Sequence, residues 1–336
     1  MNMKSQSSLK CYFYLFMCVV LCVGNVSVTF AASPPAYPTK SIEFVGPFAA
    51  GGGSEQTARI LIPAIEKRWK QTINIVAKPG GNTVIGTAYV MRAAPDGYTT
   101  MQESPGSSAM QVMMKDLPFK VMDRTYICNI LQIPGVLYVP ANSPWKTLQD
   151  VVAAAKKDPS SFTWGSLGGS STADLVMLQF FAAAGIDVAK TKPVTFPGAG
   201  PAMNAVAGGH VQFSGTTANT VMAFESGGLI RVLGVSSQKR LNVWPNVPTF
   251  KELGFPSVTA LTYVGVSAPP GIPQYVVAAW EKVIQDVLNN DKDVVAMLEK
   301  NGQFPMFLRS SDYRKYIEEY SRDVMKFLKA PTAPAH

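Results

Sequence analysis

One unit recurs along the chain and constrains its fold more than any other feature: a short strand, a glycine- and serine-rich loop, then a helix. In the first unit, the β-type stretch Ile42–Val45 runs into Gly51-Gly52-Gly53, and apolar residues at helical spacing follow Ser54. Similar units lie in SFTWGSLGGSSTADL, PVTFPGAGPAMNAV and HVQFSGTTANTV. Strands that alternate with helices in this way predict α/β layers with mainly parallel strand pairing.

The loops of these units leave backbone N–H groups unpaired at a helix start, a geometry that favours an anion. No lysine or arginine lies within Phe48–Thr57. The charge of an anionic ligand would therefore be met by backbone N–H groups, hydroxyls and helix dipoles. The loop hydroxyls could equally fill turns and cap helices. They are those of Ser54, Ser166, Ser170, Ser171, Thr172, Thr216 and Thr217.

Two residues near the first glycine loop each allow two interpretations. Glu55 either stabilises the first turn of its helix against the dipole, or points at the ligand and favours an amine or hydroxyl there. Phe48 is either strand-end core or an apolar wall against the carbon skeleton of the ligand, and we favour the wall.

The N-terminal segment has the order of a secretory signal peptide. Lys4 and Lys10 precede the apolar run Cys11–Val23, which is too short to span a bilayer, and small residues follow. We expect a signal peptide over 1–31, cleaved near Ala31, and export to the periplasm. Cleavage lowers the net charge from +8 to +6 and leaves one cysteine, Cys128, which we expect in the core. The remaining positive charge is scattered, so we expect no nucleic acid partner.

Residues suited to catalysis or cofactor binding are scarce. The sequence has two histidines, and no His/Cys/Asp cluster has metal-ligand spacing. The stretch Gly168–Thr172 lacks the final glycine of a nucleophile elbow. Met203 stands where the third glycine of a dinucleotide-binding fingerprint would follow Gly198 and Gly200. We therefore predict no enzyme, no cofactor and no metal.

Several motifs, in order, resemble the Bug family, the extracytoplasmic solute receptors of tripartite tricarboxylate transporters. The resemblance runs from about Tyr37 to Lys329. It is carried by YPTKSIEFVGPFAAGGGSEQTAR, AKPGGNTVIGTAYVMRAAPDGYT, TWGSLGGSSTADL, FPGAGPAMNAVAGGHV, NVPTFKELGFP and YVGVSAPPGIP. It implies an α/β, two-lobed class-II periplasmic binding protein fold, with the ligand cleft between lobes joined by a hinge. Turn-rich stretches at Val136–Trp145 and Leu261–Pro273 fit such a hinge. We expect lobe 1 over 33–140 and 261–330, and lobe 2 over 141–260.

The resemblance also implies a site for a small carboxylate. The loop after the first strand holds one carboxylate in the family, and the other lobe contributes the loops around Ser166–Thr172 and Pro197–Gly200. The candidate ligand-binding residues are Phe48, Gly51, Gly52, Gly53, Ser54, Glu55, Ser166, Gly168, Gly169, Ser170, Ser171, Thr172, Pro197, Gly198, Ala199, Thr216 and Thr217. Asp174 replaces a histidine common in the family, and polar residues common around Phe196-Pro197 are missing. This loss indicates a more apolar, even aromatic, ligand core.

The predicted function is that of a monomeric periplasmic receptor. It captures a small aliphatic or aromatic mono- or dicarboxylate and delivers it to the membrane permease subunits of a tripartite tricarboxylate transporter. One alternative is a ligand sensor for a membrane kinase. Another is an exported hydrolase, which would need a nucleophile with a base in reach.

Overall fold

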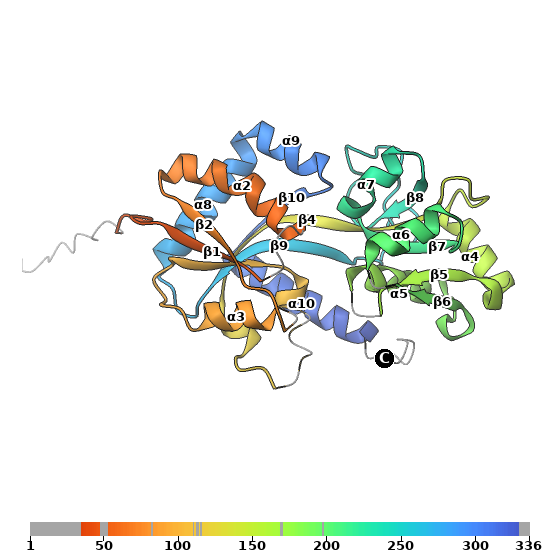
Figure 1. The fold of residues 1–336 in the computed structure, drawn as a ribbon, viewed down its shortest axis with the longest axis horizontal. Coiled ribbons are helices and arrows are strands. Elements are labelled where there is room, and N and C mark those ends of the chain that lie inside the picture. Colours follow the sequence, from red (N-terminus) through yellow and green to blue (C-terminus); the bar gives the residue numbers. More distant parts are fainter. Residues whose placement is uncertain are drawn as a thin grey trace, which may run out of the picture. The chain divides into compact units, whose positions relative to one another are not determined.

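The computed structural model describes residues 35–47, 53–81, 83–109, 111, 114, 116–168, 171–196 and 198–328. The predicted signal peptide lies outside these residues. The elements from Tyr37 onward belong to one unit (Figure 1).

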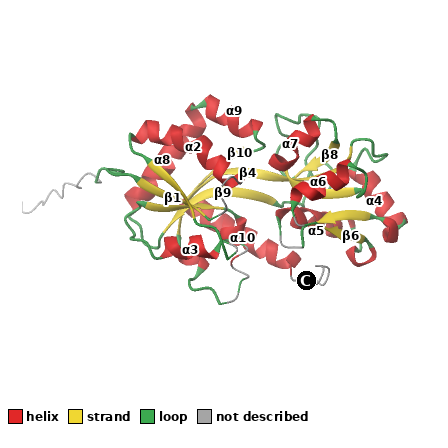
Figure 2. Ribbon diagram, viewed as in Figure 1, coloured by secondary structure: helices red, strands yellow, loops and turns green. Residues whose placement is uncertain are grey.

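The sixteen-residue strand β4 (Thr125–Pro140) organises the sheets (Figure 2). Its residues 125–134 pair antiparallel with β9 (Leu261–Ala268), and 128–132 also pair with β10 (Phe304–Arg309). Its residues 135–140 pair instead with β7 (Phe213–Thr217) and β8 (Ile230–Val235), again antiparallel. Nearly every residue of β4 is buried, as expected for a strand covered on both faces. One strand therefore belongs to two sheets, and its partners change at Pro134–Gly135.

The first sheet has the order β2-β1-β3-β9-β4, and β10 lies beside β4. Strand β1 (Ile42–Gly46) runs parallel to β2 (Ile73–Ala77) and to β3 (Thr99–Glu103). The helices that precede or follow these strands in the chain are α2 (Gly53–Trp69), α3 (Val84–Met91), α8 (Gln274–Asn290), α9 (Lys292–Lys300) and α10 (Ser310–Leu328). Trp69 and Trp280 join α2 to α8 edge to face, with ring centroids 4.7 Å apart.

The second sheet continues β4-β7-β5-β6. Strand β5 (Thr163–Ser166) runs parallel to both β6 (Lys192–Thr195) and β7. The helices of this part are α4 (Leu148–Lys157), α5 (Thr172–Ala184), α6 (Ala199–Ala207) and α7 (Ala218–Ser226). Short 3₁₀ turns occur at η1 (Pro105–Ser107), η3 (Val121–Asp123), η4 (Pro159–Ser161) and η5 (Val188–Lys190). Helix α5 is apolar on nearly all sides because it is buried on nearly all sides.

Two apolar cores run along β4. One gathers side chains of α2, α6, α7 and α8, and the other gathers those of α4, α5 and α10. Cys128 is a free, buried thiol of the first core, which confirms its predicted place.

The expectation of mainly parallel pairing is wrong. Among the described strands four pairs are parallel and five are antiparallel. The strand–loop–helix units do pair in parallel, because each crossover helix returns the chain in the same direction. Each antiparallel pair involves β4, β9 or both.

Candidate functional site

The carboxyl ends of β5, β6 and β7 lie at one edge of the second sheet, because the three strands are parallel neighbours. Each strand leads directly into a helix at that edge, where ligands bind in open α/β sheets. Eight of the predicted ligand-binding residues lie there, which is how the fold gathers segments far apart in sequence. They are Ser166, Gly168, Ser171, Thr172, Gly198, Ala199, Thr216 and Thr217.

Asp174 organises the loop between β5 and α5. Its Oδ1 accepts hydrogen bonds from Ser166 Oγ and Leu167 N, both at 2.8 Å. Its Oδ2 accepts from Ser171 Oγ at 2.7 Å and from Ser171 N at 3.3 Å. Ser171 in turn caps α5 by accepting from Asp174 N. A ligand that used the Ser166 or Ser171 hydroxyl would therefore compete with a buried carboxylate.

Sequence reasoning noted Asp174 only as a departure from the family pattern. The spacing Ser171-x-x-Asp174 is that of a capping box and could have identified this role. The capping interpretation is confirmed for Ser171, and the Ser166 hydroxyl pairs with the same carboxylate.

Helices α6 and α7 begin differently from α5. Neither has an acidic residue in its first turn, and no side-chain capping bond occurs at either N-cap, Gly198 or Thr217. Thr217 Oγ1 donates instead to Asn219 Oδ1 at 2.7 Å. A Cβ added at Gly198 would meet nothing within 4 Å. Neither helix therefore has a capping or acidic side chain of its own to offset the positive end of its dipole, whereas Asp174 offsets that of α5.

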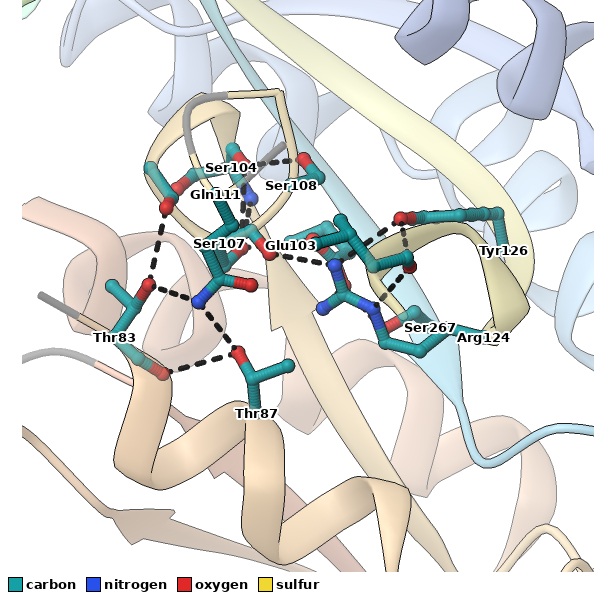
Figure 3. Close-up of polar contacts among 12 residues, drawn as sticks. Thr83, Thr87, Glu103, Ser104, Ser107, Ser108, Gln111, Arg124, Tyr126 and Ser267 are labelled. Carbon is teal, nitrogen blue, oxygen red and sulfur yellow. Dashed lines mark hydrogen bonds and ion pairs between the residues drawn. The ribbon is translucent and has the colours of Figure 1, made fainter. Parts of the chain in front are cut away.

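The carboxyl ends of β1, β2 and β3 form the matching edge of the first sheet. Lys78 N donates to Gly46 O at 2.8 Å, and Thr83 Oγ1 donates to Gly106 O at 3.1 Å. Gln111 Nε2 donates to Thr83 Oγ1 at 2.8 Å, so the loops after all three strands are tied together (Figure 3).

For nine of the predicted ligand-binding residues the structure describes no side-chain contact. Gly53, Ser54 and Glu55 form the first turn of α2, and the structure does not describe their side chains. Lying outside the described residues are Phe48, Gly51, Gly52, Gly169, Ser170 and Pro197.

A buried ion pair supports the loop after β3. Arg124 Nη1 lies 2.6 Å from Glu103 Oε1, and both side chains are fully buried (Figure 3). Ser267 Oγ and Ser107 Oγ also donate to the Glu103 carboxylate, at 2.5 and 2.8 Å. Arg124 Nη2 donates to Ser107 O, which fixes η1. Burial raises the pKa of Glu103, while Arg124 and the serine hydroxyls act against that rise. No sequence signal links two charged residues so far apart in the chain.

The turn between α9 and β10 contacts the starts of two helices. Gln56 Nε2 donates to Asn301 Oδ1 at 2.8 Å, and Thr57 Oγ1 donates to Gln303 Oε1 at 3.0 Å, so the turn lies against the beginning of α2. A Cβ at Gly302 would lie 2.6 Å from the backbone N and Cα of Asn219, so the same turn abuts the first turn of α7.

The start of α2, next to the first glycine loop, and the start of α7, next to Thr216 and Thr217, are therefore neighbours across one turn. Thr172 Oγ1 and Thr262 Oγ1, 3.1 Å apart, similarly join the start of α5 to β9. Sequence reasoning missed Gln303, which carries no motif.

No group of three or more His, Cys, Asp or Glu side chains able to hold a metal ion occurs in the part of the chain that the structure describes. In the same part, no helix is both long and apolar enough to cross a membrane.

Known proteins share both the sequence and the fold. A family model described as "Tripartite tricarboxylate transporter family receptor" matches residues 57–331. Protein BugT of Bordetella pertussis is 26% identical over 303 residues, covering 88% of this chain and 91% of BugT. The crystal structure of a TctC solute-binding protein from Polaromonas superposes with a TM-score of 0.74 at 26% identity, covering 87% of this chain and 99% of that one.

An R. palustris protein solved with adipate has a TM-score of 0.73 at 24% identity, covering 89% of this chain and 98% of that one, a likeness of fold alone. These neighbours confirm the α/β periplasmic binding protein fold expected from the sequence. The matched family is one of receptors and not of enzymes. The chain belongs to the receptors of the tripartite tricarboxylate transporter family, the family that its Bug-like motifs indicated.

Proposed function

We propose that this receptor captures a small carboxylate between the facing edges of its two sheets and delivers it to the permease of a tripartite transporter. One observation carries the proposal: the starts of α2 and α7 lie against the same turn. A ligand between them would touch elements of both sheets. The structural neighbour solved with adipate supports a dicarboxylate of similar size as a ligand to test.

The two lobes in this proposal correspond to the two sheets. The expected division, 33–140 with 261–330 against 141–260, is kept with one adjustment. The partners of β4 change at Pro134–Gly135, so we place the first crossing there and not at 140. Gly135 N donates to Ala260 O at 3.2 Å, which brings this crossing beside the second one, at Ala260–Leu261. Adjacent crossings suit a hinge.

Neutral donors hold the carboxylate in this proposal. None of the seventeen proposed ligand-binding residues is a lysine or arginine. The N-termini of α6 and α7, which have no acidic residue in their first turns, supply a favourable electrostatic potential, and the start of α2 supplies further N–H groups. Binding to both lobes favours the closed form, because only that form makes both sets of contacts. The closed form then docks on the permease.

The test is a ligand screen on the mature protein, beginning at residue 32, unfolded and refolded once to remove any bound molecule. The panel spans adipate, succinate, malate, citrate, benzoate, the phthalates, amino acids and, as a control, alkylamines. An acid present at a hundred times its Kd adds about 2.7 kcal/mol to the stability of the folded protein and raises its melting temperature.

Titration calorimetry then gives the Kd of each hit. Failure of every acid in both assays would refute carboxylate capture. A hydrolase would cleave an ester or amide of the acid and release the free acid, whereas a receptor returns either compound unchanged. A crosslink to a membrane kinase, in place of permease subunits, would favour the sensor alternative.

A further inference from the structure

We propose that Gln303 is a ligand-contacting residue that donates its side-chain amide N–H to a carboxylate oxygen and so determines selectivity for acids. This inference rests on the proposed function and deepens it. It assigns a specificity role to a residue outside all of the glycine- and serine-rich loops.

The amide of Gln303 is only half satisfied. The residue is fully buried, and its Oε1 accepts a hydrogen bond from Thr57 Oγ1 at 3.0 Å. Its Nε2 is also buried and has no hydrogen-bond partner among the described residues. An unpaired buried N–H group is costly, and such groups are uncommon in native proteins. Two donor hydrogens therefore have no described acceptor in the unliganded protein.

The amide of Gln303 lies where the two halves of the proposed site meet, at the turn that contacts the starts of α2 and α7. Thr57, whose hydroxyl donates to Gln303 Oε1, is the fifth residue of α2. The amide nitrogen Nε2 is bonded to the same carbon as Oε1, so it also lies near the start of α2. The preceding residue, Gly302, abuts the backbone of Asn219 in the first turn of α7. The following residue, Phe304, pairs with Gln132 on β4, two residues before the crossing. Gln303 thus lies between the starts of two helices whose N–H groups favour an anion.

The chemistry of the amide nitrogen specifies the ligand group. An amide N–H₂ donates and does not accept, so it pairs with a carboxylate or carbonyl oxygen and rejects an ammonium group. Because Nε2 is already buried and unpaired, its bond to a ligand oxygen requires no loss of a bond to water on the protein side. A neutral donor here is also consistent with the absence of lysine and arginine from the proposed binding residues.

Two substitutions test the role. Gln303→Met keeps a similar volume and removes the donor, while Gln303→Glu keeps an acceptor for Thr57 and replaces the donor with a carboxylate. A hydrogen bond to a charged group is expected to change affinity by about 10- to 100-fold. We expect Gln303→Met to weaken binding of the acid found by the screen by that factor, and Gln303→Glu to weaken it further by repulsion. Gln149→Met, at an exposed glutamine of α4, is the matched control and should bind as the wild type does.

The melting temperature of the unliganded protein separates a ligand contact from a structural role. We expect Gln303→Met to melt within a few degrees of the wild type, because the amide makes one hydrogen bond in the unliganded protein. Wild-type affinity in both variants would overturn the inference and leave the proposed function intact. Weak binding with a matching loss of stability in both variants would also overturn it. A wild-type protein that binds no acid would overturn the proposed function itself, and this inference with it.

Discussion

Replacing Arg124 by methionine should destabilise the protein strongly. The arginine makes four hydrogen bonds within a fully buried cluster: to Glu103 and Ser107 at 2.6 Å, to the Tyr126 hydroxyl at 3.1 Å and to Val121 O at 3.2 Å. Methionine can make none of them, and it leaves the Glu103 carboxylate buried without its counter-charge. Breaking one side of a buried pair costs about 3–5 kcal/mol. That is a large part of the 5–15 kcal/mol by which domains are typically stable.

The measurement is the free energy of unfolding by urea at pH 7, monitored by tryptophan fluorescence. Arg314→Met is the matched control, because Arg314 pairs with Glu318 on the exposed face of α10, where a pair contributes at most about 1 kcal/mol. The double variant Arg124→Met, Glu103→Met should regain most of the loss, because no charge is then left buried. A cost below about 1 kcal/mol for Arg124→Met, or no recovery in the double variant, would contradict the reasoning.

The stability of the Arg124→Met variant should depend on pH in a defined direction. Burial raises the pKa of Glu103, and without Arg124 the main opposing influence is gone, so its pKa in the folded state rises further. A folded-state pKa above the unfolded value, which is near 4.3, means that the folded variant holds a proton that the unfolded chain releases. The variant should therefore lose stability as pH rises from about 4.3 through the raised folded-state pKa. An equal deficit at pH 5 and pH 8 would refute this account.

Three further predictions follow from the site and the core. Gly302→Ala should cost about 1–2 kcal/mol for its positive φ and should also weaken ligand binding, because its Cβ would meet Asn219. Gly228→Ala, also at positive φ but in open space, should cost stability alone, and equal ligand affinity in the two variants would count against the α7 contact. Asp174→Ala should lower the free energy of unfolding by about 2 kcal/mol, because it removes the carboxylate that accepts hydrogen bonds from Ser166, Leu167 and Ser171. An unchanged free energy of unfolding in urea would contradict this role. The thiol of Cys128 should not react with Ellman's reagent in the native protein, because burial raises its pKa. The unfolded mature chain should show one reactive thiol, whereas four would mean that the N-terminal segment is retained.

Local sequence patterns determined much of this fold. The strand that begins at Ile42 and the helix that begins at Gly53 follow from the spacing of apolar residues and the position of the glycines. Both signals extend over only a few residues of the chain. The strand–loop–helix units predicted which loops reach the carboxyl edge of the second sheet, because parallel strands with crossover helices have that geometry. The buried place of Cys128 followed from its strand-like surroundings.

Only the tertiary structure decided how the strands pair and which polar groups remain free. The switch of β4 between sheets depends on partners more than a hundred residues away, such as Leu261. The Ser166 hydroxyl, which looked available for a ligand, pairs with Asp174 once α5 packs beside β5. Gln303 carries no motif, yet it lies buried between α2 and α7 with an unpaired donor. Period and propensity describe neighbours in the chain, whereas hydrogen-bond satisfaction in the interior depends on residues that only folding brings together.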